Sequence, residues 1–376
     1  MAVEITAVTV HLLYAVPEER IAMSFGVLGR RAMALVELQC SDGSAGYGES
    51  WINYPSWAGA ERRATITEGV APLLTGKNPD DVIARHDELV RALVPLGRQW
   101  GAPGPISQAI SGTDIALWDR YGRVLNRPVC EVLGNVVRDR VPVYASSLGP
   151  TGVANQADVC RQQGFDLVKL KVGFGREMDE ANLTAVREAL GDQVALAVDA
   201  NQRWSLEEAL SMADALHRAG VVWVEEPIAG SPLPDIEEFY RRTGVPVAIG
   251  ENLYLRSAFE PYIASPAVQV LQPDVSKSGG ITELVAICER AYVAGKTVMP
   301  HLYGGALAFA ASLQLAACCP AIERIEYDVR SNPLRDPLLR EAPVQVRGMV
   351  TIPMGAGLGV DLDLAAVQRV AQSGEG

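Results

Sequence analysis

From residue 141 onwards, short apolar strands alternate with amphipathic helical stretches, and this alternation admits few folds. The predicted strands are residues 141–146, 167–172, 194–198, 221–224, 245–249, 268–272, 297–300 and 322–325. Strict alternation of strands and helices favours a parallel barrel over an open sheet. An open doubly wound sheet is the alternative. No glycine-rich GxGxxG turn follows an early strand, however, so a dinucleotide-binding version of that sheet has little support.

The first part of the chain has a different pattern. Residues 3–13 and 32–39 are rich in β-forming residues, and residues from about 60 to 127 have apolar side chains at helical spacing. Strands followed by helices indicate an α+β unit. Residues 344–352 again have β character, so we expect the C-terminal part of the chain to return to this first unit.

The composition excludes several classes of function. The formal net charge is −12, and a nucleic-acid-binding surface needs basic side chains. No apolar run is long enough to span a bilayer, and the N-terminal residues have neither the basic start nor the cleavage site of a secretory signal. We therefore expect a cytoplasmic protein that binds neither nucleic acid nor a membrane. The cysteines show no CxxC spacing and are predicted to be free thiols: Cys40, Cys130, Cys160, Cys288, Cys318 and Cys319.

Titratable side chains stand at the ends of seven successive predicted strands. In chain order they are Lys169 and Lys171, then Asp199, Glu225, Glu251, Asp274, His301 and Glu326. In a barrel these ends meet at one face, which is where the active sites of such barrels lie. Any single one of them is explained equally well as a helix cap or a solvated loop charge. Together they would crowd like charges into one small mouth, which is costly unless a cation compensates them.

The types of side chain at this mouth point to one class of chemistry. Three acidic side chains from adjacent strands suit a hard divalent cation such as Mg²⁺. Repulsion between Lys169 and Lys171 is expected to lower the pKa of one ammonium group, which makes a lysine base. His301 offers a second acid or base, and Asp274 is placed to hold its imidazole in one tautomer.

These groups suit the removal of a proton from the carbon next to a carboxylate. Mg²⁺ would grip the substrate carboxylate and stabilise the enediolate that forms when the α-proton leaves. A protonated Glu326 would donate a hydrogen bond to an enediolate oxygen, and its acidic neighbours are expected to raise its pKa.

An ordered set of short motifs resembles the enolase superfamily, in the subgroup typified by mandelate racemase. The motifs are Val168-Lys169-Leu170-Lys171, Val198-Asp199-Ala200-Asn201, Trp223-Val224-Glu225-Glu226-Pro227, Gly250-Glu251-Asn252, Gln272-Pro273-Asp274, Lys277-Ser278-Gly279-Gly280, Pro300-His301-Leu302, the later Glu326, and Ala116-Leu117-Trp118-Asp119 before the barrel. The resemblance covers nearly the whole chain. Lys-x-Lys alone is a weak signal, whereas the ordered set is specific.

The resemblance implies a modified TIM barrel, (β/α)7β, with an α+β capping domain. The barrel would span residues 128–332, and the capping domain would combine residues 1–127 with residues 333–376. The resemblance also implies a symmetric homo-oligomer, with an octamer as one form.

Roles for individual residues are likewise implied by the resemblance. Asp199, Glu225 and Glu251 become the Mg²⁺ ligands. Lys171 becomes the base on one face of the substrate, with Lys169 beside it, and the Asp274–His301 pair becomes the acid or base on the other face. Muconate-lactonizing-type enzymes have a lysine where this chain has Asp274, so lactonization ranks below reactions like that of mandelate racemase.

Two reactions of a small hydroxycarboxylate follow from one enediolate. If His301 protonates a departing β-hydroxyl, an acid sugar (an aldonate or aldarate) loses water and becomes a 2-keto-3-deoxy acid. If His301 instead reprotonates the α-carbon, the enzyme is a racemase or epimerase. Enzymes similar to this chain in both Lys-x-Lys and the Asp–His pair are more often dehydratases, so we expect dehydration. A catalytically inactive binding or assembly protein is the remaining alternative, although no expected ligand or base is missing.

Residues that choose the substrate are harder to predict. Trp51 and Tyr54 lie in a segment that is expected to form a loop over the barrel mouth, and Arg30 lies in a glycine-containing loop before it. Arg330 follows Glu326 closely enough to bind a distal carboxylate. Asn201, in the motif after the third strand, completes the candidate substrate-binding set.

Overall fold

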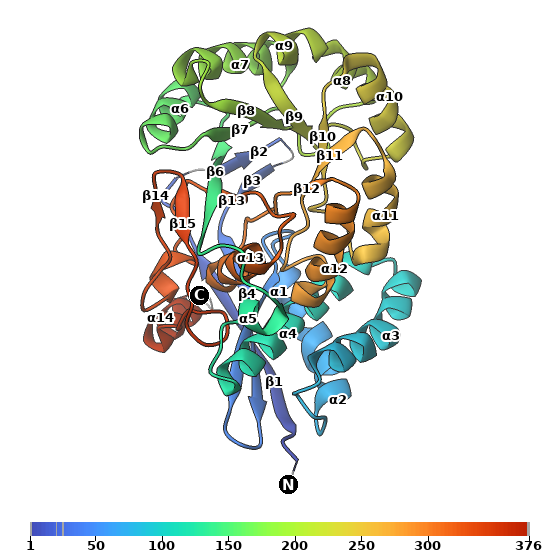
Figure 1. Ribbon diagram of the computed structural model, residues 1–376, viewed down its shortest axis with the longest axis vertical. Helices are drawn as coiled ribbons and strands as arrows, with labels where there is room; N and C mark the ends of the chain where they lie inside the picture. Colours follow the sequence, from blue (N-terminus) through green and yellow to red (C-terminus); the bar gives the residue numbers. More distant parts are fainter. Residues whose placement is uncertain (1, 20, 25, 374–376) are drawn as a thin grey trace.

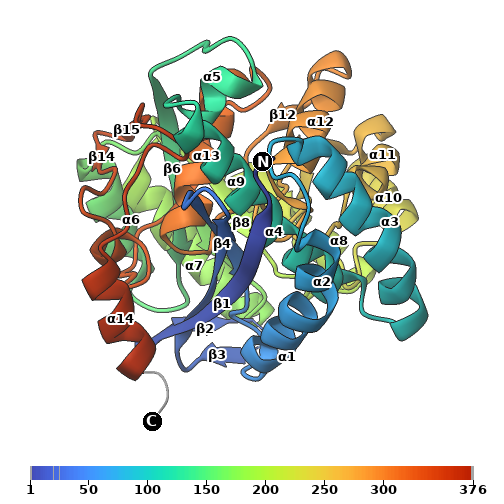
Figure 2. The ribbon, with the colours of Figure 1, turned by 90° about the horizontal axis from the view of Figure 1, so that it is seen from below.

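Two units lie one above the other in the structure, a barrel and a cap (Figure 1). The structure, a computed structural model, describes residues 2–19, 21–24 and 26–373. Figure 2 views the molecule from the side of the cap, whose strands and first helices lie in front of the barrel. Within the described part of the chain, no helix is both long enough and apolar enough to cross a bilayer.

Parallel strands form the wall of the barrel. They are β6 (Arg140–Leu148), β7 (Leu167–Lys171), β8 (Ala195–Asp199), β9 (Val221–Glu225), β10 (Val247–Ile249), β11 (Val268–Leu271), β12 (Thr297–Val298) and β13 (Ile325–Asp328). Each of β6 to β11 pairs in parallel with the next strand, and β13 pairs in parallel with β6. A bridge between Val298 and Ile322, just before β13, links the remaining two strands. The predicted α/β barrel is confirmed.

The eighth strand lies later in the chain than the sequence pattern predicts. Residues 322–325 were the expected strand, but β13 begins only at Ile325. Ile322 makes an isolated bridge to β12, whereas Glu326 pairs with Tyr144 of β6. The apolar residues of 322–325 therefore only approach the barrel, and the strand itself carries Glu326.

Helices cover the outside of the barrel. They are α6 (Val153–Gln162), α7 (Arg176–Leu190), α8 (Leu206–Ser211), α9 (Ala213–Arg218), α10 (Leu233–Thr243), α11 (Arg256–Ala264), α12 (Gly280–Val293) and α13 (Ala306–Cys318). In α7 the buried Leu183, Val186 and Leu190 follow helical spacing, so one stripe packs on the barrel. Ser205 and Glu208 form a capping box at the start of α8.

The barrel interior is packed with side chains, and the polar site lies directly beyond this packing. A separate buried cluster fills the interior: Tyr144, Leu167, Ala197, Trp223, Ala248, Val270 and Met299. Several polar side chains lie two residues after a member of this cluster: Lys169, Asp199, Glu225, Gln272 and His301. Alternate residues of a strand point the same way, so residues two apart both point into the barrel. Along these strands, an inward apolar residue is followed two positions later by an inward polar one.

The cap is built on an antiparallel sheet with helices against it. Its strands are β1 (Ile5–Ala15), β4 (Arg31–Cys40) and β5 (Ala45–Trp51), with a small hairpin of β2 (Ile21–Met23) and β3 (Gly26–Leu28). Its helices are α1 (Ala58–Ala64), the π-helical η1 (Thr65–Val70), α2 (Ala71–Leu74), α3 (Val82–Trp100), α4 (Pro103–Val124) and α5 (Val129–Leu133). Strand β5 lies so close to α4 that a Cβ at Gly48 would be 2.0 Å from the carbonyl oxygen of Gly112.

The C-terminal part of the chain contacts both units. It forms η2 (Asp336–Leu338), β14 (Gln345–Val346), β15 (Met349–Thr351) and α14 (Leu364–Ser373). Strand β15 pairs antiparallel with the start of β6 in the barrel, whereas α14 packs against β1 in the cap. The six cysteines are free thiols, as predicted, and all except Cys318 are buried.

A buried ionic network joins the cap to the barrel. His86 of α3 lies between Asp114 of α4, at 3.2 Å, and Glu283 of α12, at 3.1 Å. Glu283 also pairs with Arg256 of α11 at 2.8 Å. Burial opposes a charge on His86, but the adjacent carboxylates of Asp114 and Glu283 outweigh burial and raise the pKa of His86 to about 9.

The raised pKa predicts a pH-dependent contribution of His86 to stability. A group whose pKa is higher in the folded state stabilises fully below its unfolded pKa, and its contribution disappears as the pH rises through the folded value. Denaturant unfolding of His86→Gln should therefore show a deficit relative to the unsubstituted protein that is roughly 3 kcal/mol larger at pH 6 than at pH 10. An equal deficit at both pH values would contradict the charged state of His86.

Candidate active site

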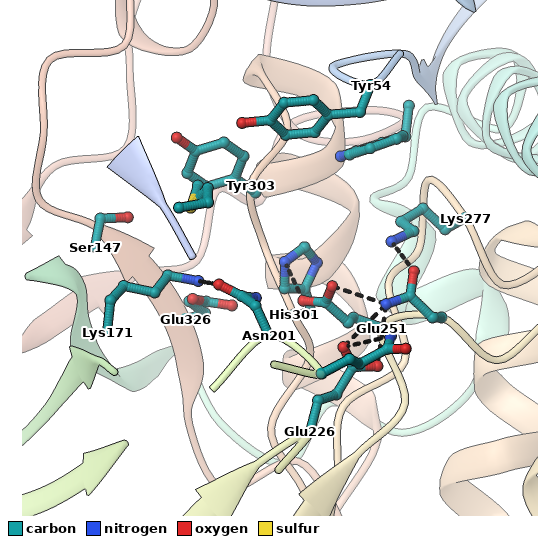
Figure 3. Close-up of a pocket in the computed structure, with 14 residues that line it drawn as sticks. Tyr54, Ser147, Lys171, Asn201, Glu226, Glu251, Lys277, His301, Tyr303 and Glu326 are labelled. Atoms are coloured by element: carbon teal, nitrogen blue, oxygen red, sulfur yellow. Dashed lines mark hydrogen bonds and ion pairs between the residues drawn. The ribbon is translucent and has the colours of Figure 1, made fainter. Parts of the chain in front are cut away.

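The predicted catalytic side chains converge at the end of the barrel that faces the cap, and Figure 3 shows three of them, Lys171, His301 and Glu326, around one cavity. Lys169 and Lys171 both point inward from β7, as their alternation predicts. Lys169 Nζ lies 2.6 Å from Glu225 Oε2 and 2.8 Å from Glu326 Oε1. Lys171 Nζ lies 2.5 Å from Asp199 Oδ2 and 2.9 Å from the side-chain oxygen of Asn201. Each lysine therefore faces carboxylates from other strands of the barrel.

The expected low pKa for a lysine is wrong for this arrangement. Burial and the charge of Lys169 do lower the pKa of Lys171, but the carboxylate of Asp199 outweighs them and the pKa lies above its ordinary value. The pKa of Lys169 is also raised, because Glu225 and Glu326 outweigh burial. The sequence showed the neighbouring lysine but not how closely the carboxylates would face each ammonium group.

The Asp274–His301 pair is formed as predicted. His301 Nδ1 lies 2.7 Å from Asp274 Oδ2, and the other oxygen of Asp274 accepts hydrogen bonds from the backbone N–H and the hydroxyl of Ser276. His301 Nε2 lies 3.0 Å from Glu251 Oε2. Burial alone would lower the pKa of His301, but the charges of Glu251 and Glu326 raise it well above its ordinary value. These carboxylates therefore favour the protonated form of the imidazole.

Glu326 points into the mouth, whereas the nearby Glu323 is exposed and contacts Thr297. The backbone N–H of Leu302 donates a 2.9 Å hydrogen bond to Glu326. The expected raised pKa of Glu326 is wrong: burial raises it, but Lys169 and His301 outweigh burial and lower the pKa below its ordinary value. Glu326 is an anion in this arrangement and accepts, rather than donates, hydrogen bonds.

The three carboxylates expected to bind metal lie at neighbouring strand ends. Asp199 and Glu225 are partners in the β8–β9 register, and Glu251 follows β10. Each of these carboxylates pairs with a basic side chain: Lys171, Lys169 and His301, respectively. Among the described residues, no group of three or more acidic, histidine or cysteine side chains is arranged to hold a metal ion. Glu225 Oε1 is nevertheless buried without a hydrogen-bond partner. Burial, and then the charge of Asp199, raise the pKa of Glu225 to about 8. An all-oxygen set with an unsatisfied buried oxygen fits a hard divalent cation.

A cavity of about 350 Å³ opens above these groups. Among the predicted residues, it is lined by Lys171, Asn201, Glu251, His301, Glu326, Trp51 and Tyr54. Lys169, Asp199, Glu225 and Asp274 are buried beneath it.

Two predicted substrate-binding residues do not line the cavity. Arg30 stacks on Tyr14 with its guanidinium carbon 3.9 Å from the ring centre and donates to the carbonyl of Ser56. Arg330 donates to the backbone carbonyls of Ser147 and Gly149, at 2.7 and 2.5 Å. It supports a residue of the cavity wall rather than the cavity itself.

Sequence reasoning missed half of the lining. The additional residues are Met23, Ser147, Gln202, Glu226, Asn252, Lys277 and Tyr303. Glu226 and Asn252 directly follow predicted metal ligands, and Lys277 opens the motif Lys277-Ser278-Gly279-Gly280. Their nearness in sequence to the predicted site residues is the signal that could have found them. Lys277 Nζ lies 4.7 Å from the ring centre of Trp51 and 3.0 Å from Asn252 Oδ1. Met23 comes from the β2–β3 hairpin, which the chain order alone does not place over the barrel.

Comparison with known proteins identifies the family of this chain. The family described as mandelate racemase / muconate lactonizing enzyme, N-terminal domain, matches residues 4–134, and the enolase C-terminal domain-like family matches residues 152–366. The chain belongs to the mandelate racemase/muconate lactonizing enzyme family. It is therefore an enzyme of the enolase superfamily.

Relatives in this family carry out related reactions. The chain is 34% identical to D-galactarolactone cycloisomerase from Agrobacterium fabrum over 97% of its length and 98% of that protein. It is 32% identical to arabinonate dehydratase from Saccharolobus solfataricus, with 91% and 92% covered.

Solved structures of the family share the fold. A mandelate racemase/muconate lactonizing enzyme from Bordetella bronchiseptica has a TM-score of 0.87 at 33% identity, covering 98% of this chain and 100% of that one. A racemase from Streptomyces coelicolor, solved with bound magnesium, has a TM-score of 0.87 at 26% identity, covering 97% and 99%.

Proposed function

We propose that this enzyme removes the α-proton of an acid sugar in a Mg²⁺-dependent reaction and eliminates the β-hydroxyl as water. The observation that carries the proposal is the pairing of two proton-transfer groups around one cavity. Lys171 comes from β7, whereas His301 follows β12, and β6 and β13 separate these strands round the ring. A substrate held between them would meet a base on one side and an acid on the other.

The fit of the carboxylates to a hard cation supports Mg²⁺ as the metal. Asp199, Glu225 and Glu251 would hold Mg²⁺, which supplies positive charge that stabilises the carboxylate oxygens of the enediolate. Lys169, which pairs with Glu326 and with Glu225, adds a buried positive charge next to these carboxylates.

The chain's own residues account for the proton transfers. Lys171 must leave its ion pair with Asp199 and become neutral before it accepts the α-proton. His301, charged and oriented by Asp274, then donates the proton from Nε2 to the departing β-hydroxyl. The enol that remains tautomerises to a 2-keto-3-deoxy acid. Atoms balance, since the product is the substrate minus one water.

Relatives support dehydration over other outcomes of the same enediolate. Three of them are named as dehydratases of arabinonate, of L-talarate and galactarate, and of D-xylonate. Isomerisation of an acid sugar or its lactone is the second candidate, because the cycloisomerase relative matches along almost the whole chain. Racemisation or epimerisation would need His301 to return a proton to the α-carbon instead.

A substrate panel tests the proposal. The purified enzyme with Mg²⁺ would be incubated with aldonates, aldarates and aldarolactones, with semicarbazide used to trap 2-keto acids and NMR to detect epimers or isomers. We expect a 2-keto-3-deoxy acid from at least one aldonate or aldarate. Formation of an epimer or isomer alone would assign the alternative, and no product from any compound would reject both.

A further inference from the structure

The cap strand β5 reaches the loop that carries His301. Its alternate residues Gly46 and Gly48 face α4, while Glu49 and Trp51 face the barrel. Trp51 lines the cavity, and Glu49 meets the start of helix α13, which begins five residues after His301. Trp51 is therefore part of the cavity wall, whereas Glu49 contacts the segment that follows His301.

Glu49 is a buried carboxylate held by backbone groups of the barrel. It is 1% exposed. Its two oxygens accept hydrogen bonds from the N–H of Gly305, at 2.5 Å, and the N–H of Ala308, at 2.9 Å. Among the described residues no basic side chain forms an ion pair with it. A buried carboxylate without a cation is expensive, and a helix N-terminus partly compensates it.

The end of the 301–305 loop packs closely against this carboxylate and against the backbone of Leu334. A Cβ at Gly304 would lie 2.7 Å from Glu49 Oε1, and one at Gly305 would lie 2.5 Å from the carbonyl oxygen of Leu334. Asn53, just after β5, donates to the carbonyl of Tyr303 at 3.1 Å. The cap thus fixes the loop at two points, both within four residues of His301.

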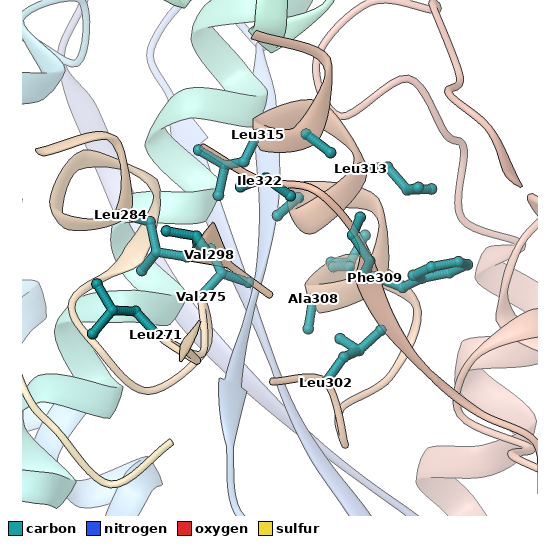
Figure 4. Close-up of a cluster of buried hydrophobic side chains, with 14 of the residues drawn as sticks. Leu271, Val275, Leu284, Val298, Leu302, Ala308, Phe309, Leu313, Leu315 and Ile322 are labelled. Carbon is teal, nitrogen blue, oxygen red and sulfur yellow. The ribbon is translucent and has the colours of Figure 1, made fainter. Parts of the chain in front are cut away.

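The same strand also touches the loop that carries Asp274. The backbone N–H of Trp51 donates to the carbonyl of Ser276 at 3.4 Å, and Ser276 donates twice to Asp274. The residues next to the pair, Val275 and Leu302, pack in the apolar cluster shown in Figure 4. Behind the pair the packing is apolar, and to the polar contacts within the barrel the cap adds those at Tyr303, Gly305 and Ser276.

We propose that Glu49 is a positioning residue for His301: its carboxylate holds the 301–305 loop so that the imidazole can donate its proton. The role rests on the proposed function. Lys171 lies on β7, which Glu49 does not contact, so loss of Glu49 affects one of the two proton transfers. A general structural role would instead weaken both transfers equally.

The test compares two rates in one sample. Glu49→Gln keeps the shape of the side chain, but its amide group faces one of the backbone N–H groups. With Mg²⁺ and the substrate in D₂O, dehydration should fall by about 10²-fold, the effect expected of a misplaced catalytic group, while α-proton exchange into recovered substrate changes little. The ratio of the two rates does not depend on how much of the variant is folded.

Two further variants sharpen the test. Glu49→Asp keeps a carboxyl group, with two oxygens that can accept from the backbone, and should retain a higher ratio of dehydration to exchange than Glu49→Gln. Glu37→Gln makes the same change on β4, where Glu37 contacts His11, and should leave the ratio unchanged. Equal losses of dehydration and exchange in Glu49→Gln, an unchanged ratio, or an aspartate variant no better than the glutamine one would overturn the role of Glu49. Absence of both reactions in the unsubstituted enzyme would instead overturn the proposed function.

Discussion

His301→Asn should stop dehydration while leaving α-proton exchange in place. Asparagine cannot supply the proton that the departing β-hydroxyl needs, and a positioned general acid contributes about 10²–10⁴-fold to the rate. Lys171 stands on another strand and still removes the α-proton from a substrate of matching configuration. The measurement is deuterium incorporation at the α-carbon by NMR, followed alongside 2-keto acid formation.

A matched histidine elsewhere provides the control. His217 is exposed and donates a hydrogen bond to the backbone carbonyl of Thr243, so His217→Asn should keep both activities. If His301→Asn retained full turnover, the assignment of the second acid would be wrong. If it lost exchange as completely as dehydration, His301 would be acting on the α-proton itself.

Loss of the metal should have a comparably large effect. Treatment with EDTA should remove turnover, and added Mg²⁺ should restore it. Glu225→Gln removes the charge of the carboxylate whose Oε1 has no partner in the structure. Loss of a residue that only hydrogen-bonds to a metal ligand weakens metal binding by about 10–100-fold. Loss of the ligand's own charge should cost more, so this variant should bind Mg²⁺ at least about 100-fold more weakly in calorimetry.

The control for this variant is an acidic residue outside the mouth. Glu323 is exposed and bonds to Thr297, so Glu323→Gln should bind Mg²⁺ as the unsubstituted enzyme does. Full turnover in EDTA would contradict metal dependence. Unchanged Mg²⁺ affinity in Glu225→Gln would contradict the ligand set but not the proton-transfer groups.

The barrel and the convergence of its polar residues could be predicted because both follow from periodicity. Alternation along β7 places Lys169 and Lys171 on one side, and strand ends of a parallel barrel share one face. The Asp274–His301 contact follows from the same rule. The roles of these residues in catalysis and metal binding stay predictions.

Charge states could not be predicted, because they depend on distances between strands. Lys171 has a lysine two residues away in sequence, yet Asp199 at 2.5 Å decides its pKa. Acidic residues stand at the ends of other strands near Glu326, but the group that pairs with it is the ammonium of Lys169, at 2.8 Å. Position along the chain shows which strands are adjacent and leaves open which side chains meet.

The candidate substrate-binding residues were only partly predictable from the sequence. Arg30 and Arg330 are chemically suited to a substrate carboxylate, but one stacks on Tyr14 and the other binds backbone carbonyls. Trp51 does line the cavity, because alternation along β5 turns it to the barrel, and Glu49 shares that face.

The central claim is that this enzyme takes a proton from the carbon next to a carboxylate. The direct measurement is NMR of a panel of acid sugars incubated with the unsubstituted enzyme and Mg²⁺ in D₂O. We predict deuterium at the α-carbon of recovered substrate, or a 2-keto-3-deoxy acid, for at least one compound, with Lys171→Ala showing neither. Exchange that persists in Lys171→Ala would contradict the assignment of Lys171 as the base. Unchanged α-protons across a broad panel would contradict the central claim itself.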